Sequence, residues 1–254
     1  MALLDVRDLT HTFGGLTAVN ALTFQVQEGA IASLIGPNGA GKTTVFNCIT
    51  GIYRPNRGTI VFRDRNLRGL RPYHIAQLGL VRTFQSIRLF PNMTALDNVL
   101  AGRHCRTRSG VASAIVRPPW QQREERKSIA RAEEMLAFVD LTARCDALAA
   151  GLSYGDQRRL EIARALATQP TLLVLDEPAA GMNPAEKDRL AQLIRRIRDR
   201  GITVLLIDHD MRLVMGVSDH VTVLNYGRKI AEGSPHEIQR DPAVVEAYLG
   251  TDEE

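Results

Sequence analysis

The chain has 254 residues, of which 44% are hydrophobic and 24% are charged. A chain of this length buries roughly 70–75% of its unfolded surface, enough for one large domain or one domain with a sizeable insertion. The net charge of +4, from 32 basic and 28 acidic residues, is smaller than the excess usual in proteins that hold duplex DNA. No apolar run approaches the ~20 residues of a membrane span, and the start, MALLDVRDLT, has no signal-peptide pattern. We therefore expect a cytoplasmic protein.

Short apolar segments predict strands in both halves of the chain. Residues 22–26 (LTFQV) alternate apolar and polar, as in a half-exposed antiparallel strand, and residues 30–36 (AIASLIG) form an apolar run that stops at a glycine-rich turn. Residues 171–176 (TLLVLD) and 202–208 (ITVLLID) are continuous apolar runs, typical of strands buried on both faces of a parallel sheet.

A helix is predicted between the last two strands. Asn183 can cap its N-terminus, Pro184 suits the first helical position and Glu186 completes a capping box. The helix should end at Gly201. Its predicted apolar face consists of Leu190, Leu193, Ile194 and Ile197. A strand, a helix and a second strand in this order indicate a crossover unit of an α/β sheet.

The middle of the chain, about residues 86–168, is predicted to be an α-helical insertion. Residues 127–141 place Ile129, Met135, Leu136 and Val139 at helical spacing. The preceding residues 104–126 mix arginine, glycine and two prolines, and we predict a loop-rich connection there. Near the C-terminus, SPHE and DPAVVEAYLG each predict a capped helix with proline at its first position.

Residues 36–44 (GPNGAGKTT) match the phosphate-loop pattern G-x-x-x-x-G-K-[ST] between a predicted strand and a helix. In such a loop, backbone N–H groups turn inward onto phosphate oxygens. Lys42 can reach the β- and γ-phosphates, and the Thr43 hydroxyl can ligate Mg²⁺. The predicted nucleotide-binding residues are Gly36, Pro37, Asn38, Gly39, Ala40, Gly41, Lys42, Thr43 and Thr44.

Two adjacent carboxylates follow the predicted strand 171–176. Asp176 at the strand end can organise Mg²⁺, and Glu177 can reach a water in line with the γ-phosphate. The alternative is that both acids cap the next helix. Kinases and small GTPases need no glutamate at this place, so Glu177 argues against those classes.

Two further polar residues are candidates. His209 follows the strand 202–208, where it could bridge the γ-phosphate and Glu177; a structural histidine is the alternative. Gln85 stands at the start of the helical insertion, where its amide could ligate Mg²⁺ or orient a water. A plain surface residue is the alternative for Gln85.

Residues 152–157 (LSYGDQ) predict another helix start, with Ser153 as its cap. The N-terminus of a helix favours negative charge and suits a phosphate. Together with GPNGAGKT, Gln85, LLVLDE and His209, this stretch resembles ABC-type ATPase subunits in order and spacing. The resemblance covers essentially the whole chain, and LSYGDQ is its most specific part.

The resemblance implies a fold: a P-loop NTPase (RecA-like) α/β core with an antiparallel β subdomain and an α-helical insertion. It implies one domain, residues 1–254. Within it we expect the β subdomain and core at about 1–85 and 169–225, the helical subdomain at 86–168, and a C-terminal extension at 226–254.

The resemblance also implies a reaction, the hydrolysis of ATP with Mg²⁺. In this family two subunits pack head to tail, so Ser153 and Gly155 would complete the ATP site of the partner subunit. The implied catalytic residues are Glu177, His209 and Gln85, and the implied metal ligands are Thr43, Gln85 and Asp176. Phe13 is expected to stack on adenine, with a core role as the alternative.

The chain departs from the family pattern at three places. The signature is usually LSGGQ, and here Tyr154 and Asp156 replace a glycine and the glutamine. The tyrosine requires an ordinary backbone conformation, and the carboxylate is mildly unfavourable near phosphate. Where relatives have an aspartate that crosses the dimer, this chain has Met182, so Asn183 or backbone would have to substitute.

Several segments resemble the branched-chain amino acid importer ATPases, including FGGLTAVN, EPAAGMNP and the ending that begins GRKIAEG. The implied partners are a second ABC ATPase subunit, in a homodimer or in a heterodimer with a related chain, transmembrane permease subunits and, indirectly, a periplasmic or extracellular binding protein. The implied location is peripheral, on the inner face of the cell membrane. The alternatives are a lipopolysaccharide-export ATPase and a non-transport ABC ATPase acting on nucleic acid, although we expect no nucleic-acid partner.

Several arginines flank the start of the helical insertion and could meet membrane subunits or anionic headgroups, with a solvated face as the alternative. They are Arg82, Arg88, Arg103, Arg106 and Arg108. The role of the arginine-rich connection 103–126 is left open by the sequence.

Overall fold

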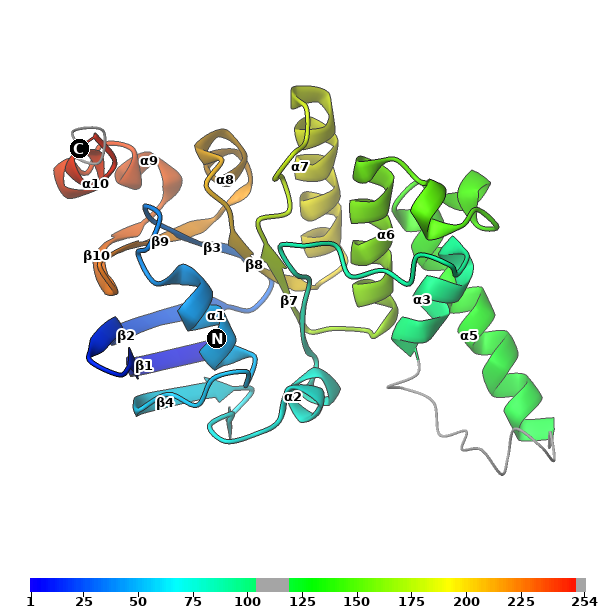
Figure 1. Ribbon diagram of the computed structural model, residues 1–254, viewed down its shortest axis with the longest axis horizontal. Helices are drawn as coiled ribbons and strands as arrows, with labels where there is room; N and C mark the ends of the chain where they lie inside the picture. Colours follow the sequence, from blue (N-terminus) through cyan, green and yellow to red (C-terminus); the bar gives the residue numbers. More distant parts are fainter. Residues whose placement is uncertain (104–118, 250–254) are drawn as a thin grey trace. The chain divides into compact units, whose positions relative to one another are not determined.

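The computed structural model describes residues 1–103 and 119–249 (Figure 1). They divide into two compact units. The first, here called the core unit, comprises Met1–Arg82 and the described residues from Thr171 onward. The second, the helical unit, comprises the described residues of Thr83–Pro170. Each unit is described by itself below.

The core unit contains an antiparallel sheet with the strand order β2-β1-β4-β5. Its long strands are β1 (Ala2–Phe13) and β2 (Leu16–Gln27), and β4 (Arg57–Phe62) and β5 (Arg65–Asn66) complete it. The predicted strand 22–26 lies within β2, where Leu22, Phe24 and Val26 are buried and the residues between them are exposed. This alternation confirms a sheet with one face on the core.

A second sheet has the strand order β10-β9-β3-β8-β7-β6. The strands are β3 (Ile31–Ile35), β6 (Leu80–Arg82), β7 (Leu172–Asp176), β8 (Thr203–Ile207), β9 (His220–Asn225) and β10 (Arg228–Gly233). All neighbours are parallel except β9 and β10. Every residue of β3, β7 and β8 is buried, which confirms the predicted apolar strands and puts their carboxyl ends at one edge.

Helices connect the strands of the core unit. They are α1 (Lys42–Ile49), α2 (Pro72–Leu78), α7 (Pro184–Asp199), α8 (Met211–Val217), α9 (Pro235–Ile238) and α10 (Pro242–Leu249). The predicted capping box at Asn183 and Glu186 is present, and Ser234 forms another with Glu237. A shared apolar core includes Leu4, Phe24, Phe46, Phe62 and Leu172, so side chains from both sheets and from α1 pack together.

The helical unit consists of α3 (Ala95–Arg103), α5 (Pro119–Phe138) and α6 (Tyr154–Ala167), with 3₁₀ turns η2 (Thr142–Arg144) and η3 (Ala149–Gly151). The three helices pack on one another. Met135, Leu136 and Val139 are buried, as predicted, and Ile129 is half-buried. Among the described residues of this unit the backbone forms one isolated β-bridge, Thr94–Leu148, and no longer strand.

The prediction of a loop-rich connection over residues 104–126 is wrong for its last part. Residues 119–126 form the first two turns of α5. The stretch WQQREER contains good helix formers but no apolar stripe, so periodicity could not reveal it. Residues 104–118, including Arg106 and Arg108, lie outside the described residues. In the part of the chain that is described, no helix is long and apolar enough to cross a membrane.

Candidate nucleotide-binding site

The phosphate loop joins β3 to α1, and its shape depends on close backbone contacts. A Cβ added to Gly36 would lie 2.1 Å from the carbonyl oxygen of Leu224, and one added to Gly41 would lie 2.4 Å from that of Ala18. Gly41 also caps α1 with a φ of 100°. Residues 36–41 are thus pressed against β2 and β9 in a conformation that only glycine allows at these two positions.

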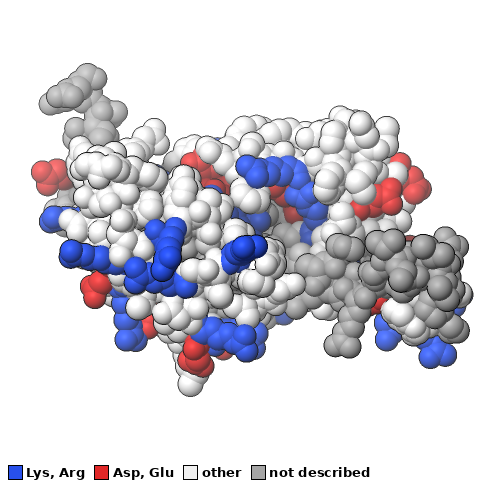
Figure 2. All heavy atoms as spheres, turned by 60° about the horizontal axis from the view of Figure 1, so that its bottom comes forward, with Lys and Arg blue, Asp and Glu red and all other residues white. Residues whose placement is uncertain are grey.

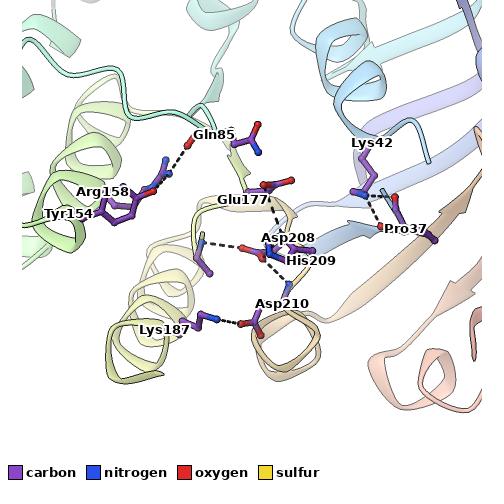
Figure 3. Close-up of polar contacts among 12 residues, drawn as sticks. Pro37, Lys42, Gln85, Tyr154, Arg158, Glu177, Lys187, Asp208, His209 and Asp210 are labelled. Atoms are coloured by element: carbon purple, nitrogen blue, oxygen red, sulfur yellow. Dashed lines mark hydrogen bonds and ion pairs between the residues drawn. The ribbon is translucent and has the colours of Figure 1, made fainter. Parts of the chain in front are cut away.

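Lys42 begins α1 and turns its side chain back into the loop (Figure 3). Its ammonium donates hydrogen bonds to the carbonyl oxygens of Gly36 at 2.6 Å and Pro37 at 2.8 Å. Burial lowers the pKa of Lys42, and the negative charge of Glu177 partly opposes that shift. The ammonium therefore lies at the centre of the loop, where phosphate oxygens can replace the two carbonyls as acceptors.

The turn between β9 and β10 packs against the phosphate loop and is hydrogen-bonded to it. The Gly227 amide donates to the carbonyl of Ala40 at 3.0 Å, and the Gly227 carbonyl accepts from the Asn20 amide at 2.8 Å. Tyr248 lies on α10. Burial raises the pKa of its hydroxyl to about 12, and the backbone of Gly36 opposes part of that rise. The C-terminal segment thus contacts the phosphate loop directly.

Asp176 ends β7 with its side chain 6% exposed, and it is paired with Arg82. The Arg82 guanidinium donates to Oδ2 of Asp176 at 2.6 Å and to Oδ1 of Asn47 on α1 at 2.8 Å. The suggestion that Arg82 meets a membrane is therefore wrong, because its side chain is buried inside the core unit. The pair was not visible in the sequence, since 94 residues separate its members.

Glu177 and His209 come together at the carboxyl edge of the sheet (Figure 3). Nδ1 of His209 lies 4.0 Å from Oε2 of Glu177. Glu177 has a left-handed backbone, with a φ of 45°, and its amide donates to the carbonyl of Ile207 at 2.8 Å. The bond fixes the residue after β7 to the end of β8, so both side chains project from the same edge.

Asp208 is a functional candidate that sequence reasoning missed. Its side chain is fully buried, and burial raises its pKa. Its carboxylate accepts hydrogen bonds from the amides of Ala179 at 3.1 Å and Asp210 at 2.9 Å. The available signal was a carboxylate at the end of an apolar strand, the same feature that identified Asp176.

Phe13 is the last residue of β1 and is 44% exposed. Its ring makes edge contacts with His11, at a centroid distance of 4.6 Å, and with Tyr53, at 5.3 Å. This exposure rules out the alternative of a core residue. An exposed aromatic ring at this place is compatible with stacking on a ligand ring.

The oxygen donors of the core unit suit Mg²⁺. Thr43 stands exposed in the first turn of α1, and Asp176 supplies a carboxylate. The described residues contain no cluster of three or more His, Cys, Asp or Glu side chains that could enclose a metal. Mg²⁺ commonly binds through one or two protein groups, substrate phosphates and waters, so this sparse donor set fits it.

The signature stretch lies in the helical unit at the start of α6. Ser153 caps the helix, and its hydroxyl oxygen accepts from the amide of Asp156 at 3.2 Å. Tyr154 has the helical backbone expected of it and is 44% exposed, whereas Gly155 is buried. The Asp156 carboxylate is paired with Arg159, which reduces its repulsion of a nearby phosphate.

Gln85 also belongs to the helical unit, and its backbone is tied to α6 (Figure 3). The fully buried Arg158 donates to the carbonyls of Phe84 and Gln85, each at 2.7 Å, and pairs with Glu161 at 2.8 Å. Burial raises the pKa of Glu161, and the charge of Arg158 opposes the rise. Gln85 and Ser153 are thus carried by one rigid assembly around α6.

Comparison with known proteins identifies the family of the chain. Residues 19–180 match the family model described as ABC transporter, and residues 228–254 match the model described as branched-chain amino acid ATP-binding cassette transporter. The high-affinity branched-chain amino acid transport ATP-binding protein LivG of Salmonella typhimurium is 49% identical over 249 residues, 98% of each chain.

Two solved structures are also similar. The ADP conformation of MJ1267, an ATP-binding cassette of an ABC transporter, has a TM-score of 0.87 and 33% identity, covering 98% of this chain and 99% of that chain. The dimeric structure of MJ0796, a bacterial ABC transporter cassette, has a TM-score of 0.75 and 26% identity, covering 91% and 98%. These matches confirm the predicted fold class. The chain belongs to the ABC transporter family of ATP-binding proteins.

Proposed function

We propose that this chain is the ATP-binding and ATP-hydrolysing subunit of an ABC importer for branched-chain amino acids. The observation that carries the proposal is the 49% identity with LivG over 98% of both chains. The match of residues 228–254 to the branched-chain amino acid model supports the same substrate class. In this role the chain supplies energy, and permease subunits and a binding protein handle the amino acid.

The core unit binds the nucleotide. The backbone of residues 36–44 surrounds the phosphates, Lys42 supplies a positive charge and Phe13 stacks on adenine. Thr43 and Asp176 would hold Mg²⁺, and the hydrogen bond from Arg82 orients the Asp176 carboxylate. Bound Mg²⁺ neutralises charge on the β- and γ-phosphates. Gln85, carried by the helical unit, is proposed as a further ligand.

Glu177 is the general base. Its Oε2 accepts a proton from the water that attacks the γ-phosphate, and the imidazole of His209, 4.0 Å from Oε2, orients the carboxylate and the phosphate. We prefer this role to simple helix capping because Asn183 caps α7.

ATP is held between two subunits, each of which supplies what the other's site lacks. Ser153 accepts one hydrogen bond as a cap, and a hydroxyl that accepts keeps its own proton to donate. We infer that this proton, with the backbone amide of Gly155, contacts the γ-phosphate of the partner subunit's ATP. Such contacts gain strength when water is excluded at an interface. The dimeric cassette of MJ0796 supports pairing of this kind.

The proposed location is the inner face of the cell membrane, and the charge distribution supports it. Residues 54–71 contain six of the 32 basic residues and one of the 28 acidic ones, so this segment carries +5 and the rest of the chain −1. All six arginines are exposed. Figure 2 brings forward the side of the core unit on which β4 and α2 lie, and Lys and Arg side chains gather there. A basic surface of this kind attracts anionic headgroups.

Two alternatives are less well supported. A lipopolysaccharide-export ATPase would share the phosphate loop and signature, but the match over residues 228–254 favours amino acid transport. A nucleic-acid ATPase of the same family lacks a specific observation in its favour. We expect no nucleic-acid partner.

The proposal is tested by uptake in the native organism. Deletion of the gene should abolish high-affinity uptake of radiolabelled leucine, isoleucine and valine, and the wild-type gene should restore it. Glu177→Gln should fail to restore uptake although it still binds ATP. Unchanged uptake in the deletion strain would contradict the substrate class, and a defect in lipopolysaccharide export instead would favour the alternative.

A further inference from the structure

The buried carboxylate of Asp208 has no part in the reaction proposed above, although it contacts the backbone that follows Glu177 and the backbone that follows His209. Asp208 follows β8, and its side chain has no exposed surface. Burying a charged carboxylate is costly unless strong hydrogen bonds replace its lost water. The position therefore needs an explanation in terms of the groups that the carboxylate contacts.

The two oxygens of Asp208 bind different loops (Figure 3). Oδ2 accepts from the amide of Ala179 at 3.1 Å, two residues after Glu177. Oδ1 accepts from the amide of Asp210 at 2.9 Å, one residue after His209. One buried side chain thus fixes both the turn that follows Glu177 and the turn that carries His209.

We propose that Asp208 is a positioning residue that holds Glu177 and His209 in register for ATP hydrolysis. The inference rests on the proposed roles of those two residues. Glu177 has a strained φ of 45°, and such a conformation persists only where the surroundings enforce it. The backbone bond from Glu177 to Ile207 fixes the start of the turn, and the Asp208–Ala179 bond fixes its far side.

The charged neighbourhood is consistent with this role. Nδ1 of His209 lies 3.9 Å from Oδ1 of Asp208 and 4.0 Å from Oε2 of Glu177, so the ring stands between the two carboxylates. Asp210, the residue after His209, pairs with Lys187 of α7 at 2.6 Å and caps α8 by accepting from the amide of Leu213. Asp210 therefore contacts α7 and α8, whereas Asp208 holds the turn after Glu177 and the turn that carries His209.

Asp208→Asn provides the test, with Asp210→Asn as the matched control. An asparagine at 208 keeps one acceptor but presents an NH₂ group, which cannot accept, to the second amide. We expect kcat to fall about 10- to 100-fold, because a small displacement of reacting groups is costly, while the Kd for ATP stays within about twofold. Asp210→Asn keeps an oxygen that can cap α8 but loses the ion pair with Lys187, so stability should fall slightly while kcat stays within about threefold.

If Asp208 had a purely structural role, Asp208→Asn would lower stability without a large fall in kcat at a nearly unchanged Kd for ATP. The inference is overturned if Asp208→Asn has wild-type kcat, or loses no more activity than Asp210→Asn. If Asp208→Asn does not fold, amide hydrogen exchange in the wild-type chain tests the inference instead. The amide of Ala179 should exchange at least 100-fold more slowly than an unprotected amide, and free exchange there would refute the inference. Wild-type turnover in Glu177→Gln would instead overturn the proposed function.

Discussion

At the level of single residues, the conformation of the phosphate loop depends on the close backbone contacts of its glycines. Gly36 is placed so that any side chain would meet the carbonyl of Leu224 on the neighbouring strand. Leu224 pairs with Lys229 of β10 in the sheet, so its backbone has little room to move aside. The loop's shape is therefore set by backbone packing before any nucleotide binds.

Gly36→Ala should lower the free energy of unfolding by about 2 kcal/mol or more, from the clash and the positive φ of 152°. Binding of a fluorescent ATP analogue should weaken at least tenfold, because the loop must shift. Gly15→Ala is the control, since a Cβ there meets nothing within 4 Å. Its stability should change by less than about 0.5 kcal/mol. Equal effects of the two substitutions would show that the close contact is unimportant.

The sequence predicts residues that act through a local motif and misses those that act through a distant partner. Lys42, Thr43 and Asp176 stand in short patterns whose chemistry can be inferred from spacing alone. The pairing of Arg82 with Asp176, and the binding of two loops by Asp208, depend on which strands become neighbours in the sheet. That order is not encoded in any local spacing.

At the level of elements, α6 carries both the signature residues and the segment that contains Gln85. Arg158 and Glu161 lie one turn apart on this helix, and their side chains are 0% and 2% exposed. Glu161 accepts from the amide of Arg88, and Arg158 donates to two carbonyls of the same segment. The pair therefore joins residues 84–88 to α6.

Arg158→Met should destabilise the helical unit by about 3–5 kcal/mol, because it leaves the Glu161 charge buried without its partner. Urea unfolding followed by the fluorescence of Trp120 on α5, the single tryptophan of the chain, measures this. Arg131→Ala is the control, since it breaks an exposed pair with Glu134 at the same spacing. We expect that loss to be about 0.5 kcal/mol or less.

A loss from Arg158→Met as small as that from Arg131→Ala would show that the buried pair does not hold the segment. Removing both partners with Arg158→Met and Glu161→Leu should recover most of the stability, because no unpaired charge then remains.

Strand and helix prediction succeeded where periodicity was clean. The capping box at Asn183 and the buried strands β3, β7 and β8 follow from composition and pattern. The alternation in β1 is broken by irregular pairing with β2 and by a left-handed backbone at Asp8, which shifts the inward face along the strand. The start of α5 has no apolar stripe, so only its intrinsic propensity favours a helix.

At the level of the whole molecule, the positive charge is unevenly distributed. The segment 54–71 holds more net charge than the entire chain. Each basic side chain near an anionic membrane surface contributes about 1 kcal/mol. We therefore expect this segment to draw the subunit toward an anionic membrane surface.

Replacing Arg57, Arg65 and Arg71 with glutamine should reduce binding to vesicles of phosphatidylglycerol by at least tenfold at moderate salt. Cosedimentation measures it. The control replaces three exposed arginines with glutamine: Arg189 and Arg196 on α7, and Arg200 at its C-cap. The control loses the same charge and should bind as the wild type does. Equal losses would mean that net charge alone, and no particular surface, governs binding.

The division of the ATP site between two subunits is tested most directly by mixing two inactive variants. Lys42→Ala lacks a working phosphate loop, and Ser153→Arg lacks a working signature. If ATP is held across the interface, a mixed dimer contains one intact site, made of Lys42 from one chain and Ser153 from the other. ATPase activity should therefore appear on mixing, at a tenth or more of the wild-type rate. Activity that stays at the sum of the two separate variants would contradict a site shared between two copies of this chain.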